Sequence, residues 1–311
     1  MLNEFALMPD VLWQPAESEA ELHRSTLEHL SGLLLNDGLV RDLRDGKWRE
    51  YLATNLGILR LPGKELFESL CKGGRIRPAA STPLPPPEDI DGWLYEATRS
   101  SEDSPVGCKL TAALAQHSLA EQEDNPFTVS VLRMQATDWW RARSCSVRLD
   151  RKTRDYIRHL GPVFRHSNSL MFIDPNLDPT KPNYAEFGEL LKPAVHGGTV
   201  SLIEIHRSAK DSDNYPKRNE WIARFQSLAA AFPQGRIKLK VFVWEDFHDR
   251  YLISNLIGMS VPHGFDICTD PRRYQLRTTW TRLSRTDADD VQRDFDRSRN
   301  PNRLRFEPIE F

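Results

Sequence analysis

The sequence lacks the signatures of the common metal and redox sites. Its four cysteines are far apart, so no CxxC pair indicates a zinc site or a redox-active pair. No HExxH-like spacing is present either. We therefore expect neither a bound metal nor a cofactor. Scattered reduced thiols are also typical of a cytoplasmic protein.

Long apolar runs are missing as well. The longest aliphatic cluster, Leu33 to Leu35, ends at Asn36, whereas a membrane-spanning helix needs ~20 apolar residues. The first residues, MLNEFALMPDVLWQ, include acidic side chains and no basic segment, unlike a secretory signal. The sequence therefore predicts a cytoplasmic protein without a transmembrane segment.

Charge of one sign does not dominate, because the formal net charge is -2. This excludes a protein coated with nucleic-acid-binding charge. The distribution is uneven, however, since nine basic residues lie between Arg133 and Arg165 and only three acidic ones oppose them. That segment is either a surface that faces phosphates or an ordinary solvated helix face.

The 311 residues are enough for two domains, and 39% hydrophobic residues support a packed core. Residues 1–140 are predicted to be mostly helical, with a Pro-rich loop over residues 78–89. Apolar spacing and stop signals predict helices at residues 19–35, 46–59, 64–71, 92–99 and 106–119, and a strand at 127–134.

Residues 150–311 follow a different pattern, in which strands and helices alternate. Strands are expected at residues 170–173, 200–205, 236–244, 248–254 and 259–267, with helices near 152–164, 184–194 and 221–232. Such an alternation predicts an α/β sandwich with a mixed, mainly parallel sheet.

The stretch WEDFHDRYLISN, residues 244–255, contains the main candidate site. If residues 248–254 form a strand, His248 and Arg250 point to the same face. An imidazole beside a cation is suited to phosphoryl transfer, because the imidazole attacks phosphorus and the cation neutralises the phosphate oxygens. The alternative is that His248 is a structural residue at a strand edge.

Other polar residues follow neighbouring predicted strands. Asp174 ends one strand, and His206 and Arg207 end the next. Ligands of open α/β sheets bind at the carboxyl ends of strands, so these three residues are candidate substrate-binding residues beside His248. Each of them also has an ordinary structural interpretation at a strand end.

The residues His248, Arg250 and Asn255 resemble the His-x-Lys and Asp motif of the phospholipase D-like superfamily. The spacing is the same, with Arg in place of Lys and Asn in place of Asp. Within that superfamily the sequence resembles the phospholipase D-like C-terminal domain that follows MIT domains, whose His-Asp-Arg strand precedes a Gly and an Asp-containing turn. Here these are Gly258 and the GFDI of residues 264–267.

This resemblance implies a phospholipase D-like domain over residues 150–311 and two possible functions. The first is a metal-independent phosphodiesterase, a nuclease of a bacterial anti-phage defence system. In it His248 is the nucleophile, Arg250 the phosphate clamp and Asn255 the residue that orients the histidine. Active members need two motifs, so a homodimer is expected. The alternative is a catalytically inactive interaction module that binds a protein partner, a nucleic acid or an anionic lipid.

Overall fold

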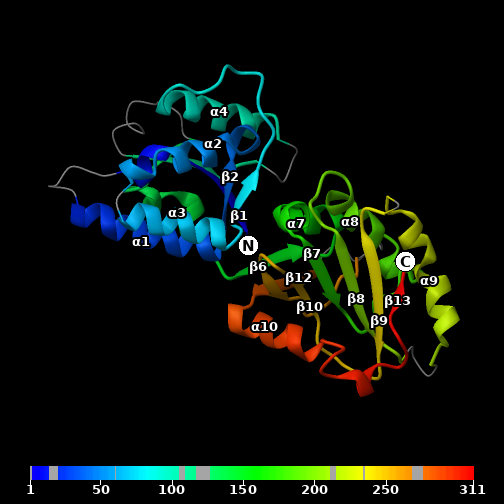
Figure 1. The fold of residues 1–311 in the computed structure, drawn as a ribbon. Helices are drawn as coiled ribbons and strands as arrows, with labels where there is room; N and C mark the ends of the chain where they lie inside the picture. The colour runs from blue at the N-terminus through cyan, green and yellow to red at the C-terminus, as the bar shows by residue number, and fades with distance from the viewer. Residues whose placement is uncertain are drawn as a thin grey trace. The chain divides into compact units, whose positions relative to one another are not determined.

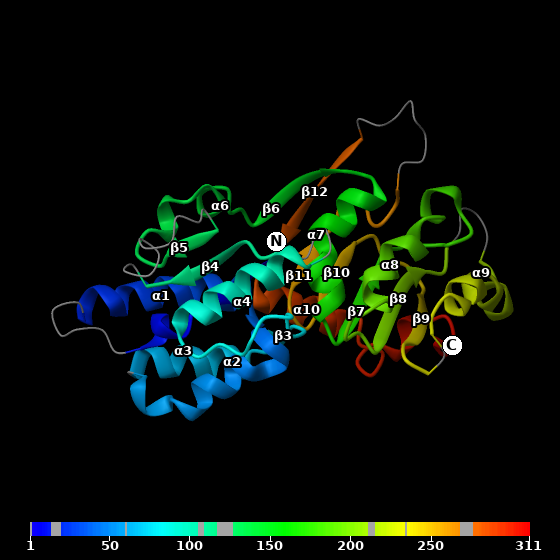
Figure 2. The same cartoon turned by 90° about the horizontal axis from the view of Figure 1, so that it is seen from above.

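The computed structural model describes residues 2–13, 20–59, 61–104, 109–116, 127–210, 215–233, 235–267 and 276–311. The chain divides into two compact units, Leu2–Arg143 and Ser144–Phe311. Each unit contains its own sheet (Figures 1 and 2). The α/β fold expected from the sequence is therefore confirmed, and it applies to both parts of the chain.

The N-terminal unit is built on a five-stranded parallel sheet in the order β3-β2-β1-β4-β5. Its strands are β1 (Asn3–Leu7), β2 (Gly38–Asp42), β3 (Ile76–Pro78), β4 (Ala112–Ala115) and β5 (Thr128–Ser130). Its α-helices are α1 (Ala20–Asn36), α2 (Leu43–Thr54), α3 (Leu61–Lys72), α4 (Ile90–Glu102) and α6 (Asp138–Arg141). The expected mostly helical region is thus organised by a sheet that the sequence analysis missed.

The helix expected at residues 106–119 is wrong where the structure describes it. Ala112–Ala115 forms β4, which lies between β1 and β5 and is buried along its whole length. Alanine and leucine favour helices in isolation. A strand inside a parallel sheet is buried on both faces, however, and appears in sequence as a short continuous apolar run. Burial against both faces outweighed local helix propensity here.

The Pro-rich segment is an extended loop, as expected. It begins at Pro78, the last residue of the edge strand β3, and leads to Asp89, whose carboxylate caps α4. Arg44 donates to the carbonyl of Leu84 at 2.9 Å, and Asp45 accepts from the hydroxyl of Ser81 at 2.8 Å. Arg44 and Asp45 both have positive φ angles, so their tethering of the loop offsets the strain of that conformation.

The C-terminal unit contains an eight-stranded sheet in the order β13-β9-β8-β7-β10-β11-β12-β6. Its strands are β6 (Ser146–Asp150), β7 (Ser169–Ile173), β8 (Leu202–Ser208), β9 (Lys238–Trp244), β10 (Tyr251–Ser254), β11 (Gly258–Ser260), β12 (Arg277–Arg282) and β13 (Ile309–Glu310). Its helices are α7 (Thr153–His166), α8 (Phe187–Val195), α9 (Arg218–Ala230) and α10 (Arg285–Asp294).

This sheet is mixed, as expected, but it is not mainly parallel. Among the strands that the structure describes, only β7, β8 and β9 run parallel to one another. The other pairings are antiparallel. The parallel strands are joined through crossover helices, whereas the short link between β10 and β11 can only produce antiparallel neighbours.

The two faces of this sheet are covered differently. Phe172 of β7 contacts Phe164 of α7 and Phe187 of α8 on one face. Met171 and Ile173 alternate with Phe172, so they point to the other face, where they join a cluster with Ala288 of α10. Figure 1 shows α7 and α8 on one side of these strands and α10 on the other.

Candidate functional site

A candidate binding pocket lies where β7 ends and β10 begins. These two strands are antiparallel neighbours, with Tyr251 opposite Ile173. Arg250, just before β10, is therefore held beside Asp174, just after β7. Its Nε lies 3.6 Å from Oδ1 of Asp174, and its Nη1 donates to the carbonyl of His248 at 3.1 Å. Two segments about 75 residues apart in the chain thus meet through one arginine.

Asp174 is fully buried and organises the loops around the pocket. Its carboxylate accepts from the backbone N–H groups of Asn176 and Phe265, both at 3.0 Å, and from the hydroxyl of Tyr184 at 2.9 Å. Burial raises the pKa of Asp174, while these hydrogen bonds and Arg250 act in the opposite direction. Asp174 is therefore a structural anchor with little access to a ligand.

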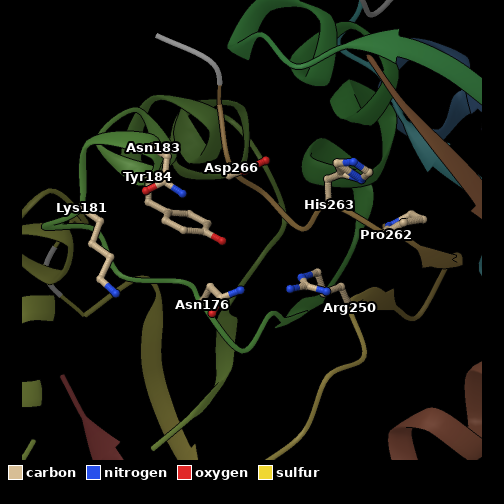
Figure 3. Close-up of a pocket in the computed structure, with 8 residues that line it drawn as sticks. All are labelled: Asn176, Lys181, Asn183, Tyr184, Arg250, Pro262, His263 and Asp266. Carbon is tan, nitrogen blue, oxygen red and sulfur yellow. The ribbon is translucent and has the colours of Figure 1, made fainter. Parts of the chain in front are cut away.

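Gly264 makes this anchor possible. Its φ is +64°, and a Cβ at this position would lie 2.6 Å from Cγ of Asp174. Only glycine lets the backbone of the 261–265 turn approach the carboxylate so closely. The turn then carries Pro262 and His263 to one side of the pocket and Asp266 to another (Figure 3).

The pocket has a volume of about 430 Å³ and collects several basic and amide side chains. Figure 3 shows the residues that line it, namely Asn176, Lys181, Asn183, Tyr184, Arg250, Pro262, His263 and Asp266. Asp266 is paired with Arg151, and its carboxylate charge is thereby largely compensated. Arg250, Lys181 and His263 carry N–H donors that line the same pocket, and charge-assisted hydrogen bonds from such donors bind anions such as phosphate.

His248 does not lie in a strand, which corrects the expectation for residues 248–254. The strand β10 begins at Tyr251, and residues 246–250 form a loop. The His248 side chain is 92% exposed, and its Nε2 lies 3.9 Å from Asp246. The shared face expected for His248 and Arg250 therefore does not form, because alternation of side chains applies only within a paired strand. Arg250 lines the pocket, and His248 does not.

Asn255 lies at the other end of β10. Its side-chain oxygen accepts from the backbone N–H of Asn168 at 2.8 Å, before the start of β7. The four residues of β10 separate Asn255 from Arg250 by roughly 15 Å. Asn255 therefore ties two strand ends together and does not join Arg250 and His248.

The residues at the end of β8 do not converge on this pocket either. His206 is buried on the α10 face of the sheet, where its ring stacks on Phe242 with a centroid distance of 4.4 Å. Burial lowers the pKa of His206 to about 3, so the ring is neutral. Arg207 is buried on the opposite face, with its guanidinium 3.7 Å from the ring centroid of Trp221 in α9. Of the six predicted site residues, the structure brings together Arg250 and Asp174.

Apart from Arg250, none of the residues that line the pocket was predicted from the sequence as a site residue; they include Lys181, Asn183, Tyr184 and His263. The first three belong to the long loop after β7, and a loop at the carboxyl end of a strand is a signal that could have identified them. His263 comes next to the GFDI turn, which was noticed only through a family resemblance. Within the described residues, no group of three or more His, Cys, Asp or Glu side chains could hold a metal ion. No helix among them is long and apolar enough to cross a membrane.

Comparisons with known proteins do not assign this chain to a family. No protein-family model matches the sequence, and no curated protein matches it. Among solved structures, the chain is similar to the archaeal chromatin protein TrmBL2, which is described as showing a novel mode of DNA binding, with a TM-score of 0.30 and 10% sequence identity. The match covers 56% of this chain and 58% of that protein, so the chain spans little more than half of the structure it matches.

Proposed function

We propose that the C-terminal unit is a divergent phospholipase D-like domain that binds a phosphate group of its ligand in the pocket around Arg250. It acts as an interaction module without hydrolysing that ligand. The observation that carries the proposal is the position of Arg250, which Asp174 orients while its guanidinium lines a pocket shared with Lys181 and His263. A guanidinium held in this way binds phosphate oxygens through two parallel hydrogen bonds.

A binding role is favoured over hydrolysis by the separation of the motif residues. Histidine-based phosphodiester hydrolysis needs the nucleophile, the cation and the orienting group at one phosphorus atom. Here His248 is exposed, Asn255 is at the other end of β10 and His206 is buried on the α10 face. The proposal includes the cytoplasmic location and the protein or nucleic-acid partner expected from the sequence.

Replacement of Arg250 tests the binding role. We expect Arg250→Ala to weaken the affinity for phenyl phosphate about ten-fold or more, because a charge-assisted hydrogen bond to an anion contributes about 1.5–3 kcal/mol. Arg250→Lys keeps the positive charge but loses the paired guanidinium donors. Its affinity for phenyl phosphate should therefore lie between those of the unchanged protein and Arg250→Ala. The measurement is isothermal titration calorimetry of the full chain, with thermal unfolding to confirm that each variant is folded.

The control for this test is Arg154→Ala. Arg154 is an arginine of the same unit, on α7, and its side chain is 90% exposed. It does not line the pocket. Equal affinities of Arg250→Ala and Arg154→Ala for phenyl phosphate would contradict the proposal.

A metal-independent phosphodiesterase is the second candidate, and one observation supports it. His263 lines the same pocket as Arg250, so an imidazole and a phosphate clamp are close together after all. In this mechanism the imidazole nitrogen attacks phosphorus, the bond to the leaving oxygen breaks, and that oxygen receives a proton. Water then cleaves the phosphorus–nitrogen bond. A second histidine, supplied by the partner in a homodimer, would donate the proton that the leaving oxygen receives.

Hydrolysis in EDTA separates the two candidates. With bis-p-nitrophenyl phosphate and plasmid DNA as substrates, the binding module is expected to release no p-nitrophenolate and to leave the DNA intact. Activity that is lost in His263→Ala but kept in His248→Ala would establish the phosphodiesterase with His263 as nucleophile. The reverse pattern would restore the role predicted for His248.

A further inference from the structure

A second pocket, of about 510 Å³, lies on the α10 face of the C-terminal sheet, apart from the pocket around Arg250. Its lining residues belong to β7, β8 and β9 on one side and to α10 and the segment after it on the other. The lining residues are Met171, Glu204, His206, Lys240, Phe242, Asp289, Gln292, Arg293, Phe295, Asp296, Arg297 and Arg299. None of them lines the pocket around Arg250.

The floor of this second pocket is set by the strand register. Met171, Glu204 and Lys240 are direct neighbours across β7, β8 and β9, and His206 is opposite Phe242 in the next row of that face. Met171, Phe242 and Phe295 belong to one buried apolar cluster. The floor is therefore apolar and aromatic, with two polar side chains of β8 set into it.

One of these polar groups is an unused hydrogen-bond donor. His206 Nδ1 lies 3.0 Å from Nε1 of Trp244, and indole nitrogen can only donate. Nδ1 is thus the acceptor, and the proton of the neutral ring is on Nε2. His206 Nε2 is buried and has no hydrogen-bond partner in the part of the chain that the structure describes. A buried donor without an acceptor costs free energy, so a ligand atom that accepts from Nε2 would be favoured here.

The other polar group is an unused acceptor. The Glu204 side chain makes no hydrogen bond or ion pair within the described residues, although the residue is only partly exposed. Its neighbour in the register, Lys240, interacts with Glu204 electrostatically and forms an ion pair with Glu310 at 3.3 Å. Glu204 and His206 are two residues apart on one strand face, so their Cα atoms are roughly 6–7 Å apart. These two side chains suit a flat ring that has hydrogen-bond donors and an acceptor side by side on one edge. The donors of the ring would face the Glu204 carboxylate, and its acceptor would face the N–H of His206.

The part of the pocket formed by α10 and the segment after it carries three arginines, Arg293, Arg297 and Arg299. Arg293 and Arg297 pair with Asp290 and Glu307. The backbone N–H of Arg299, by contrast, donates to the carbonyl of Asp296 at 3.1 Å, and its side chain makes no hydrogen bond or ion pair within the described residues, with only an electrostatic influence on Asp296. The pocket thus combines an aromatic floor, an unpaired donor and acceptor, and a cation at its mouth.

From this arrangement we infer that the second pocket binds a guanine nucleotide, free or at the end of a single strand. The guanine N1–H and exocyclic amino group donate to Glu204, and O6 accepts from His206 Nε2–H. The ring packs on the Phe242 and Phe295 wall, and the phosphate reaches Arg299. Bases outside a duplex are recognised in this way, by aromatic contact together with hydrogen bonds to their Watson–Crick edge.

Adenine provides the discriminating comparison, because it has an acceptor at N1 and no donor pair for a carboxylate. We expect the full chain to bind GMP at least ten-fold more tightly than AMP. In Glu204→Gln this preference should fall to less than three-fold. Arg299→Ala should weaken GMP binding several-fold while leaving guanosine binding unchanged. Quenching of tryptophan fluorescence is a suitable signal, because the indole of Trp244 is hydrogen-bonded to His206, which lines the pocket.

The variant Arg250→Ala separates this inference from the proposed function. It alters only the pocket around Arg250, so the affinity for GMP should be unchanged. A parallel loss of GMP and phenyl phosphate binding would show that both ligands bind in the pocket around Arg250. Equal binding of GMP and AMP, or binding of neither, overturns the inference. So does a guanine preference that survives in a folded Glu204→Gln, with folding checked by thermal unfolding.

Discussion

Replacing Gly264 by alanine is expected to lower the free energy of unfolding of the C-terminal unit by about 3 kcal/mol or more. Two effects add. The residue has φ +64°, a conformation that costs a non-glycine residue about 1 kcal/mol. In addition, the new Cβ would lie 2.6 Å from Cγ of Asp174, and relieving this overlap must disturb the buried carboxylate and its hydrogen bonds.

Gly197→Ala is the matched control for this variant. Gly197 also has a positive φ, of +91°, but a Cβ there would meet no atom within 4 Å. It should therefore show the backbone cost alone, about 1 kcal/mol. Urea unfolding of the two variants gives the difference. A Gly264→Ala protein as stable as Gly197→Ala would show that Asp174 is not held in the way described, and it would remove the basis for the orientation of Arg250.

Arg41→Ala should have an effect of similar size in the N-terminal unit, with an expected loss of about 3–5 kcal/mol. Arg41 and Glu4 are both buried, and the guanidinium binds the two carboxylate oxygens of Glu4 at 2.9 Å each. It also donates to the carbonyl of Ser100. Truncation leaves the Glu4 carboxylate buried without its counter-ion, and this accounts for most of the expected cost.

Two further variants test that explanation. The double variant Glu4→Met, Arg41→Met removes both charges and should recover most of the lost stability. Arg24→Ala breaks an exposed i,i+4 pair with Glu28 and should change stability by less than about 0.5 kcal/mol. Hydrogen exchange of the β1 and β2 amides locates the effect within the N-terminal unit. If the double variant is as unstable as Arg41→Ala, loss of packing rather than an uncompensated charge is the cause.

The elements that sequence reasoning predicted well are those whose side chains repeat within one element. The helix at residues 19–35 corresponds to α1, Ala20–Asn36, because Leu27, Leu30 and Leu34 recur at helical spacing and are all buried. The strand at 170–173 corresponds to β7, and the strand at 236–244 contains β9. In these segments the buried residues recur at a spacing set within the element itself. That spacing can therefore be recognised in the sequence of the segment alone.

The segment Ala112–Ala115 shows where such reasoning ends. Nothing within AALA distinguishes a helix from a buried strand, because the choice depends on β1 and β5 on either side. The same limit applied to residues 248–250, where β10 begins only at the first residue that can pair with β7. Strand pairing is a contact between distant segments, and periodicity within one segment does not report it.

The candidate site divides along the same line. The sequence by itself determined the alternation of strands and helices in residues 150–311 and the polar residues that follow the strands. It also identified Arg250 as a candidate site residue. Only the tertiary structure decided which of them meet. Antiparallel pairing of β10 with β7 placed Arg250 beside Asp174, and the Gly264 turn brought His263 to the same pocket. Burial on opposite sheet faces separated His206 from Arg207, because side chains alternate along a strand and each face has its own partners.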